Sequence, residues 1–490
     1  MSARAPEIRV AAGLVLAALA GCSAADEAPF VEYPDGGGAT EDGGGGRSDA
    51  RAPVDGGDAE AAAPLGGKQV VAGPVFIQGA TSDGNLVFDD GKDVKVLVGG
   101  SLTPITVLAD YDSGGDSLLV RGRFVAFWLG SVAAVPLGLW SKTGGVQKSV
   151  APLTYAQALY PRYGTDDLAY AAPAGSSLRR DLWATTAGAG AGTKVVADLD
   201  TGVVSASCRP TVAWSATALV VAGCPSGAAT PNVSVYAADG SGPTKTVLAA
   251  SAPGLWLNRA RTHALVQTTT ASSLRPLSGA AAPVAIDGPI RAAAFSSDDA
   301  FVVYRQADGA VKRASTTAPA APLSLVPSAL AMYAVSPDAR LTLVATTGNV
   351  DQNDADVVLA DATTPGTLRT LAEHAAFIGL SASGTHAVWL GELGIGLEGA
   401  LYVAALPSGA PQKLSPLAER VSLDGDVVYW QEFDKATKSN VLKAARVATP
   451  GNVITIEKGL DALTAQTLVI GKSLFVASKL GLWGYPAVTP

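Results

Sequence analysis

The sequence predicts an all-β protein, a β-propeller built from four-stranded antiparallel blades. Three observations lead to this fold class: a short phrase that recurs along the chain, the spacing of its copies, and a composition poor in charge. Of the 490 residues, 48% are hydrophobic and only 16% are charged, and Gly and Ala abound. Such a chain suits closely packed strands better than long solvated helices.

The recurring phrase is clearest in "YAVSPDARLTLVATT", Tyr333–Thr347. A polar turn separates two runs of small apolar and β-branched residues, which is typical of a β-hairpin. A third strand often follows, as in Asp356–Leu371 and Gly399–Ser415, and a turn rich in Gly, Pro or Ser leads into a short fourth strand. Relatives of the phrase begin at Gly79, Tyr160, Ala292, Phe377 and Arg420.

The spacing of the turns predicts how the hairpins assemble. Turns near Asp298, Asp338, Ser383 and Asp424 are 40, 45 and 41 residues apart. This is the period of propeller blades, and a single blade cannot bury both faces of its sheet, so blades must pack face to face around an axis. Roughly 420 residues divided by this period give up to ten units, but closed rings usually have four to eight blades. We therefore expect eight blades, with seven as the next choice and two smaller propellers as the alternative.

The turn Ser336-Pro337-Asp338 resembles that of the TolB-type β-propeller repeat, which reads Ser-Pro-Asp-Gly before a strand ending in an aromatic residue. Here Ala339 replaces the glycine. Partial matches occur at Ser297-Asp298-Asp299 and Ser82-Asp83-Gly84, and the clear copies cover Ala292–Glu432. The resemblance implies a scaffold or recognition role in the cell envelope.

Residues 1–21 are predicted to be a lipoprotein signal peptide. A basic start precedes the apolar run Val10–Ala20, which is too short to span a bilayer. The run closes on "LAGC", which resembles the lipobox of bacterial lipoproteins and implies that Cys22 carries fatty acyl chains of the palmitate type. Ser23 follows instead of the Asp of inner-membrane retention signals, so the resemblance favours the outer membrane. The alternative is an ordinary secretory signal with a chance cysteine.

Residues 22–67 are predicted to be a disordered tether, and residues 68–490 the propeller. The tether is rich in Gly, Ala and Asp and has too few large apolar residues to offset the entropy of ordering. It contains ten acidic and two basic residues, which equals the whole net charge of −8. The rest of the chain is nearly neutral. This argues against nucleic acid as a partner, because phosphate binding needs a basic face.

Two cysteines remain beyond the lipidated one. Cys208 and Cys224 bracket a strand-like run that can fold back and bring its ends together. In an oxidising compartment we expect them to form a disulfide. A metal site is disfavoured because neither has a nearby His or second Cys.

The strongest candidate for a metal site is a calcium loop in "NVDQNDADVV". Its hard oxygen ligands would be Asp351, Asn353, Asp354 and Asp356. The loop lacks the glycine and the bidentate glutamate of an EF-hand, so a solvated turn is the alternative. No other cofactor is expected.

Catalytic motifs are scarce. The three histidines, His263, His374 and His386, lie beside hairpin turns, where surface or blade-edge roles explain them. The chain has no His-x-x-His pair and no Gly-x-Ser-x-Gly elbow, so neither a zinc site nor a serine nucleophile is indicated.

We therefore expect a lipid-anchored binding or scaffold module for an envelope protein or a glycan. The alternative is a propeller-type enzyme such as a lyase, a lactonase or a quinone-dependent dehydrogenase. It predicts several His, Arg, Asp or Glu side chains converging on the central funnel. The scarcity of histidine and the low charge favour the non-enzymatic interpretation.

Overall fold

The computed structural model describes residues 67–486, apart from short internal stretches (100, 112–116, 129–134, 154–158, 163–164, 175, 187–191, 201–210, 215–217, 225–231, 238–242, 249–253, 261, 268–270, 278–282, 318–320, 395–397, 461–465, 471–472 and 479). The predicted signal peptide and all of the predicted tether except Gly67 therefore lie outside the described residues. The described part contains strands β1 to β39 and one 3-10 turn, η3 (Val350–Gln352), and no α-helix. The predicted all-β class is confirmed.

Six sheets each consist of four strands that follow one another in the chain and pair antiparallel, and we number them as blades 1 to 6. Their strands are β2 (Phe76–Ala80), β3 (Leu86–Asp89), β4 (Val94–Leu97) and β5 (Ile105–Leu108); β6 (Ser117–Arg121), β7 (Phe124–Trp128), β8 (Val135–Ser141) and β9 (Gly145–Leu153); β10 (Leu159–Pro161), β11 (Asp167–Ala174), β12 (Ser176–Thr186) and β13 (Thr193–Asp200); β14 (Thr211–Trp214), β15 (Ala218–Gly223), β16 (Asn232–Ala237) and β17 (Pro243–Leu248); β18 (Gly254–Leu257), β19 (His263–Gln267), β20 (Ser272–Pro276) and β21 (Val284–Ile286); β22 (Ile290–Phe295), β23 (Phe301–Gln306), β24 (Val311–Ser315) and β25 (Leu323–Val326).

A longer, eleven-stranded sheet follows and contains three blades joined end to end. Its strands are β26 (Ala331–Val335), β27 (Leu341–Ala345), β28 (Gly348–Asn349), β29 (Asp354–Asp361), β30 (Leu368–Leu380), β31 (His386–Gly391), β32 (Gly399–Ala405), β33 (Gln412–Asp424), β34 (Val427–Asp434), β35 (Ser439–Arg446) and β36 (Ile454–Leu460). The first part of β30 pairs with β29 and its second part with β31, and β33 likewise pairs with β32 and then β34. Each long strand is thus the outer strand of one blade and the inner strand of the next.

The two long strands change direction at equivalent residues. His374 and Arg420 both have φ 50°, in the left-handed region, and they end the similar sequences "LAEH" and "LAER". A left-handed residue turns the chain without a loop. Blades 7, 8 and 9 therefore follow one another directly.

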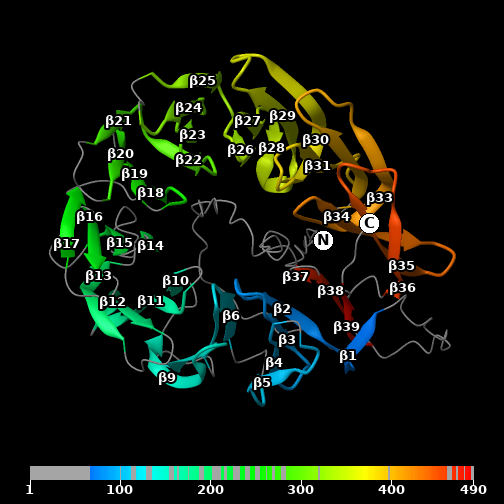
Figure 1. Cartoon of the computed structure of the whole chain (residues 1–490), viewed down its shortest axis with the longest axis horizontal. Helices are drawn as coiled ribbons and strands as arrows, with labels where there is room; N and C mark the ends of the chain where they lie inside the picture. The colour runs from blue at the N-terminus through cyan, green and yellow to red at the C-terminus, as the bar shows by residue number, and fades with distance from the viewer. Residues whose placement is uncertain are drawn as a thin grey trace, which may run out of the picture.

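The last blade closes the ring. Its strands are β37 (Gln466–Ile470), β38 (Ser473–Ser478), β39 (Gly481–Pro486) and, as the outer strand, β1 (Lys68–Ala72). The first and last described strands thus pair antiparallel, and Figure 1 shows the sheets arranged in one ring. The alternative of two smaller propellers is not observed.

Among the described residues, the strand pairing gives ten four-stranded units: seven separate sheets and three within the long sheet. The expected number of eight blades was therefore too low, whereas the division of chain length by period had allowed ten. The copies before Ala292 are too degenerate to be counted reliably from the sequence. Each of them nevertheless forms a full sheet.

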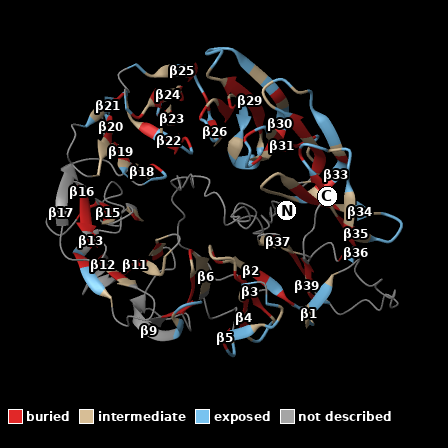
Figure 2. Cartoon of the chain, viewed as in Figure 1, coloured by how far each residue is buried: buried red, intermediate tan, exposed pale blue. Residues whose placement is uncertain are grey.

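The hydrophobic core is divided among the junctions between blades, as the buried strand residues in Figure 2 indicate. Every neighbouring pair of blades shares a cluster of buried apolar side chains. At the closing junction, Ile77 and Phe88 of blade 1 pack with Phe475 and Leu482 of blade 10. Each sheet is stabilised by its two neighbours, as the sequence predicted.

Candidate functional site

The strands nearest the ring centre carry few charges. Figure 1 places β2, β6, β10, β14, β18, β22, β26 and β37 innermost, and the second parts of β30 and β33 are the inner strands of blades 8 and 9. Within these segments the charged residues are Arg121, Arg291, Glu419, Arg420 and Asp424. Arg121 and Arg291 lie on blades 2 and 6, and the other three lie on blade 9.

The turns between the first and second strands of blades 6, 7 and 8 share one hydrogen-bonding pattern. The hydroxyl of the first turn residue accepts the N–H five residues later: Ser296 from Phe301 at 2.9 Å, Ser336 from Leu341 at 2.8 Å, and Ser381 from His386 at 3.0 Å. In two of the turns that hydroxyl also donates to an aspartate, Asp298 at 2.6 Å and Asp338 at 2.5 Å. All three serines are at most 4% exposed. The recurring phrase is therefore a side-chain-braced turn.

The fourth turn residue explains the glycine of the repeat. Gly84, Asp299, Ala339 and Gly384 all have positive φ, between 52° and 79°. Glycine adopts this conformation without steric cost, whereas other residues carry some strain there. Ala339 takes the same backbone conformation as the glycine that it replaces.

Successive turns are also joined to one another. At three junctions the second turn residue donates its N–H to the carbonyl of the second residue in the next turn: Ser82 to Gly122 at 2.7 Å, Ser297 to Pro337 at 2.6 Å, and Ala382 to Gly425 at 3.0 Å. Between blades 5 and 6, the carboxylate of Asp299 accepts the N–H groups of Arg259 and Ala260, both at 2.7 Å. In the described residues these bonds join the turns of neighbouring blades at four junctions along one rim of the ring.

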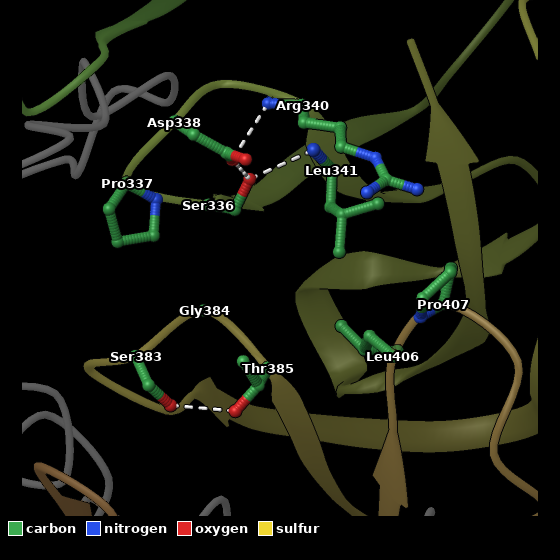
Figure 3. A pocket seen from close by; sticks show the side chains of 10 residues that line it. All are labelled: Ser336, Pro337, Asp338, Arg340, Leu341, Ser383, Gly384, Thr385, Leu406 and Pro407. Carbon is green, nitrogen blue, oxygen red and sulfur yellow. Dashed lines mark hydrogen bonds between the residues drawn. The ribbon is translucent and has the colours of Figure 1, made fainter. Parts of the chain in front are cut away.

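A groove of about 270 Å³ interrupts this rim between blades 7 and 8 (Figure 3). Half of its lining is polar or charged, and the remainder is apolar or glycine. The lining residues are Ser336, Pro337, Asp338, Arg340, Leu341, Ser383, Gly384, Thr385, Leu406 and Pro407.

The charged groups of the groove are held in place. Arg340 donates through Nε and Nη2 to the two carboxylate oxygens of Asp361, at 3.1 and 2.8 Å. This hydrogen bonding lowers the pKa of Asp361 to about 2. The carboxylate therefore stays ionised above that pH and fixes the guanidinium at the edge of the groove.

A chain of polar side chains lies behind Ser383. Ser383 Oγ donates to Asp426 Oδ1 at 3.0 Å and lies 2.7 Å from Thr385 Oγ1, which in turn is 2.9 Å from His386 Nδ1. Burial lowers the pKa of His386, partly offset by the charge of Asp426. In this order a threonine separates the imidazole from the serine, so the nucleophile–base contact of a catalytic triad is not made.

The proposed calcium ligands differ in their surroundings. Asp356 is buried, and its Oδ1 accepts the N–H groups of Thr346 and Thr347 at 2.6 and 2.8 Å. Its Oδ2 accepts the hydroxyl of Thr346. This carboxylate is used to brace the β27–β29 connection.

The other three candidates are nearer the surface. Asp351 lies in η3, Asn353 follows it with φ 55°, and Asp354 Oδ1 lies 3.0 Å from Nδ1 of the exposed His374. Among the described residues, no three His, Cys, Asp or Glu side chains gather as a metal site. Calcium binding stays a prediction.

The lipid and disulfide predictions concern residues mostly outside the described ones. Cys22 and Cys208 both lie there, whereas Cys224 is fully buried. Both modifications stay predictions. No helix within the described ranges is long and apolar enough to cross a membrane.

A buried acid lies at the junction of blades 9 and 10. Glu457 of β36 is 6% exposed and accepts a hydrogen bond from the hydroxyl of Tyr485 in β39. Burial raises the pKa of Glu457, partly offset by this hydrogen bond. The folded protein therefore binds this proton more tightly than the unfolded chain does.

Glu457→Gln is expected to stabilise the protein at neutral and alkaline pH. In the native protein, Glu457 makes its full contribution to stability below its ordinary pKa of 4.5. This contribution is lost as the pH rises from 4.5 toward the raised pKa of the folded state. The loss is about 1.4 kcal/mol for each unit between the two pKa values. Glutamine stays neutral and still accepts a hydrogen bond from the Tyr485 hydroxyl. The unfolding temperatures of the wild type and the variant should therefore diverge progressively from pH 4 to pH 8. Parallel curves would show that Glu457 does not titrate differently in the folded state.

Comparison with known proteins adds little to this description. No family model and no curated protein matches the chain. A crystal structure of the eukaryotic initiation factor is 12% identical, with a TM-score of 0.49, over 73% of this chain and 90% of that one. The Dos1 propeller is 13% identical with a TM-score of 0.38, over 66% of this chain and 91% of that one. A structure from a study of two prolyl endopeptidases is 12% identical with a TM-score of 0.38, over 77% of this chain and 55% of that one. Likeness at this level concerns the fold and carries no argument about activity.

Proposed function

We propose that this protein is a non-catalytic recognition module of the cell envelope, whose propeller binds a protein or a glycan. The observation that carries the proposal is the composition of the inner strands, whose described segments contain few charged residues. These are Arg121, Arg291, Glu419, Arg420 and Asp424. A rigid ring with a braced rim of turns is a suitable scaffold for recognition, because it holds binding loops in fixed positions.

The proposed location rests on the sequence. The lipobox at Cys22 supports acylation, and Ser23 supports the outer membrane. The acidic tether would let the ring reach partners away from the lipid surface. The resemblance of the turns to the TolB-type repeat supports an envelope role.

Affinity capture tests this function. The full-length lipoprotein with a C-terminal tag, in detergent, is incubated with solubilised envelope proteins and applied to a glycan array. We expect a saturable partner in one of the two. Absence of any partner, together with turnover in lyase, lactonase or dehydrogenase assays, would reverse the proposal.

A further inference from the structure

The connections between strands lie on two opposite faces of the ring. Successive strands of a blade are antiparallel, so the connection between the second and third strands lies on the face opposite to the turn between the first and second. The link from each outer strand to the next blade lies on that same face, which we call the hairpin face. It includes the β34–β35 hairpin of blade 9, the β38–β39 hairpin of blade 10 and the link from β1 to β2.

Large apolar side chains are exposed on the hairpin face in one sector of the ring. The described residues include nine exposed large hydrophobic side chains, and four of them lie here, between 43% and 50% exposed. They are Leu417, where β33 passes from blade 8 to blade 9, Phe433 of β34, Leu480 of the β38–β39 turn, and Phe76 at the start of β2. Blades 9, 10 and 1 follow one another around the ring (Figure 1), so the four side chains belong to one continuous sector.

Backbone hydrogen bonds bring two of these side chains together. The N–H of Gly73 donates to the carbonyl of Leu480 at 3.2 Å, and the N–H of Val75 donates to the carbonyl of Ser478 at 3.3 Å. The segment that leads into Phe76 thus runs antiparallel to the segment that ends at Leu480. The two apolar side chains therefore lie on neighbouring segments of the hairpin face.

Three lysines accompany Phe433 on the hairpin face of blade 9. Lys435 and Lys438 lie in the β34–β35 turn, and Lys458 lies near the end of β36. All three are exposed. The carboxylate of the turn, Asp434, accepts hydrogen bonds from the turn itself and interacts electrostatically with Lys458. The turn and the end of β36 therefore present three positive charges against one negative charge.

We infer that the hairpin face of blades 9, 10 and 1 rests on the surface of a bilayer that contains anionic phospholipid. The inference rests on the proposed envelope location and adds the orientation of the ring to it. Exposed aromatic and aliphatic side chains enter the boundary between headgroups and acyl chains, while neighbouring lysines attract the lipid phosphates. The combination of the two kinds of side chain on one face fits a charged bilayer surface.

The entry point of the chain agrees with this orientation. The predicted tether joins β1, which is the outer strand of blade 10 and therefore belongs to the middle of the sector. A flexible tether of about 45 residues has a root-mean-square span of roughly 35–40 Å, which allows the ring to lie on the bilayer that holds its anchor. The turns on the opposite face then point away from the membrane, toward a partner.

Lysine footprinting on the intact protein tests the inference. The full-length lipoprotein is placed in vesicles of phosphatidylethanolamine and phosphatidylglycerol, or in detergent, and its lysines are acetylated and followed by mass spectrometry. Rates are measured relative to Lys142, which is exposed in the β8–β9 turn on the opposite face. Lys435, Lys438 and Lys458 should react at least fivefold more slowly in the vesicles than in detergent.

Two pairs of substitutions separate the apolar and the charged contributions. Phe433→Ala with Leu480→Ala, and Lys435→Gln with Lys438→Gln, should each restore most of the reactivity of Lys458. Each lysine contributes about fivefold to binding of an anionic surface, so removing two weakens it about 30-fold. Val146→Ala is the matched control, because this side chain is also 43% exposed but lies on the opposite face, at the start of β9. It should leave the protection unchanged.

The outcomes separate this inference from the recognition function. Equal relative rates in vesicles and detergent, or equal protection in vesicles of phosphatidylcholine alone, would overturn the inference. Slow reaction of the three lysines already in detergent would show that another part of the chain, such as the acidic tether, covers them, and would overturn it too. Capture of a partner in detergent needs no bilayer, so the recognition function would stand in each of these cases.

Discussion

Cys22→Ser is expected to move the protein from the membrane fraction to the soluble fraction. Serine has no thiol to receive the acyl chains that the lipobox implies. Each buried methylene contributes about 0.8 kcal/mol to membrane binding, and a single acyl chain holds a protein only marginally, so losing all chains removes the anchor. Metabolic labelling with radioactive palmitate and fractionation of the cells measure the effect.

Substitution of the next residue provides the control. Ser23→Ala should keep both the label and the membrane location, whereas Ser23→Asp should keep the label but shift the protein toward the inner membrane. A Cys22→Ser chain that still takes up palmitate would show that the lipid is attached elsewhere or that the lipobox is not used.

Trp430→Ala is expected to produce the largest loss of stability among core substitutions at the junction of blades 8 and 9. The side chain is 0% exposed and packs in a cluster that includes Val388 and Val403 of blade 8, and its Nε1 donates to Glu432 at 2.8 Å. Truncating a buried tryptophan leaves a cavity and costs about 3–5 kcal/mol. The midpoint of urea unfolding should fall accordingly.

A nearby exposed aromatic residue is the matched control. Phe433 lies on the same strand, β34, but is 44% exposed. Phe433→Ala should change the free energy of unfolding by about 0.5 kcal/mol or less. Equal midpoints for the two variants would contradict the assignment of the core to the junctions between blades.

The local parts of the fold were predictable, and the third-strand segments are an example. Asp356–Leu371 and Gly399–Ser415 were predicted as a strand, a turn and a further strand, and the structure places β29, β32 and the first parts of β30 and β33 there. Alternating apolar residues and turn-forming residues act over a few positions, so they are visible in one sequence. The number of blades was not predictable from the sequence, because it also depends on how neighbouring sheets pack.

The candidate site was predictable only in part. Ser336-Pro337-Asp338 was recognised as a repeat marker, but the close contact of Pro337 with Gly384 depends on which turn lies next to it in the ring. The useful signal was present: proline stands where the related turns have residues with an N–H. Interpreting this proline requires knowing which turns are neighbours in the ring.

The sequence by itself determined the all-β class, the blade-length period and the polar hairpin turns, and it provides the only basis for the lipid anchor. Tertiary structure alone decided the ten units, the pairing of β1 with β39, and the groove at Pro337. The physical reason is the range of the interactions. Strand alternation and turn chemistry act between near neighbours in the chain, whereas ring closure and the rim of turns depend on contacts between residues about 40 or more than 400 positions apart.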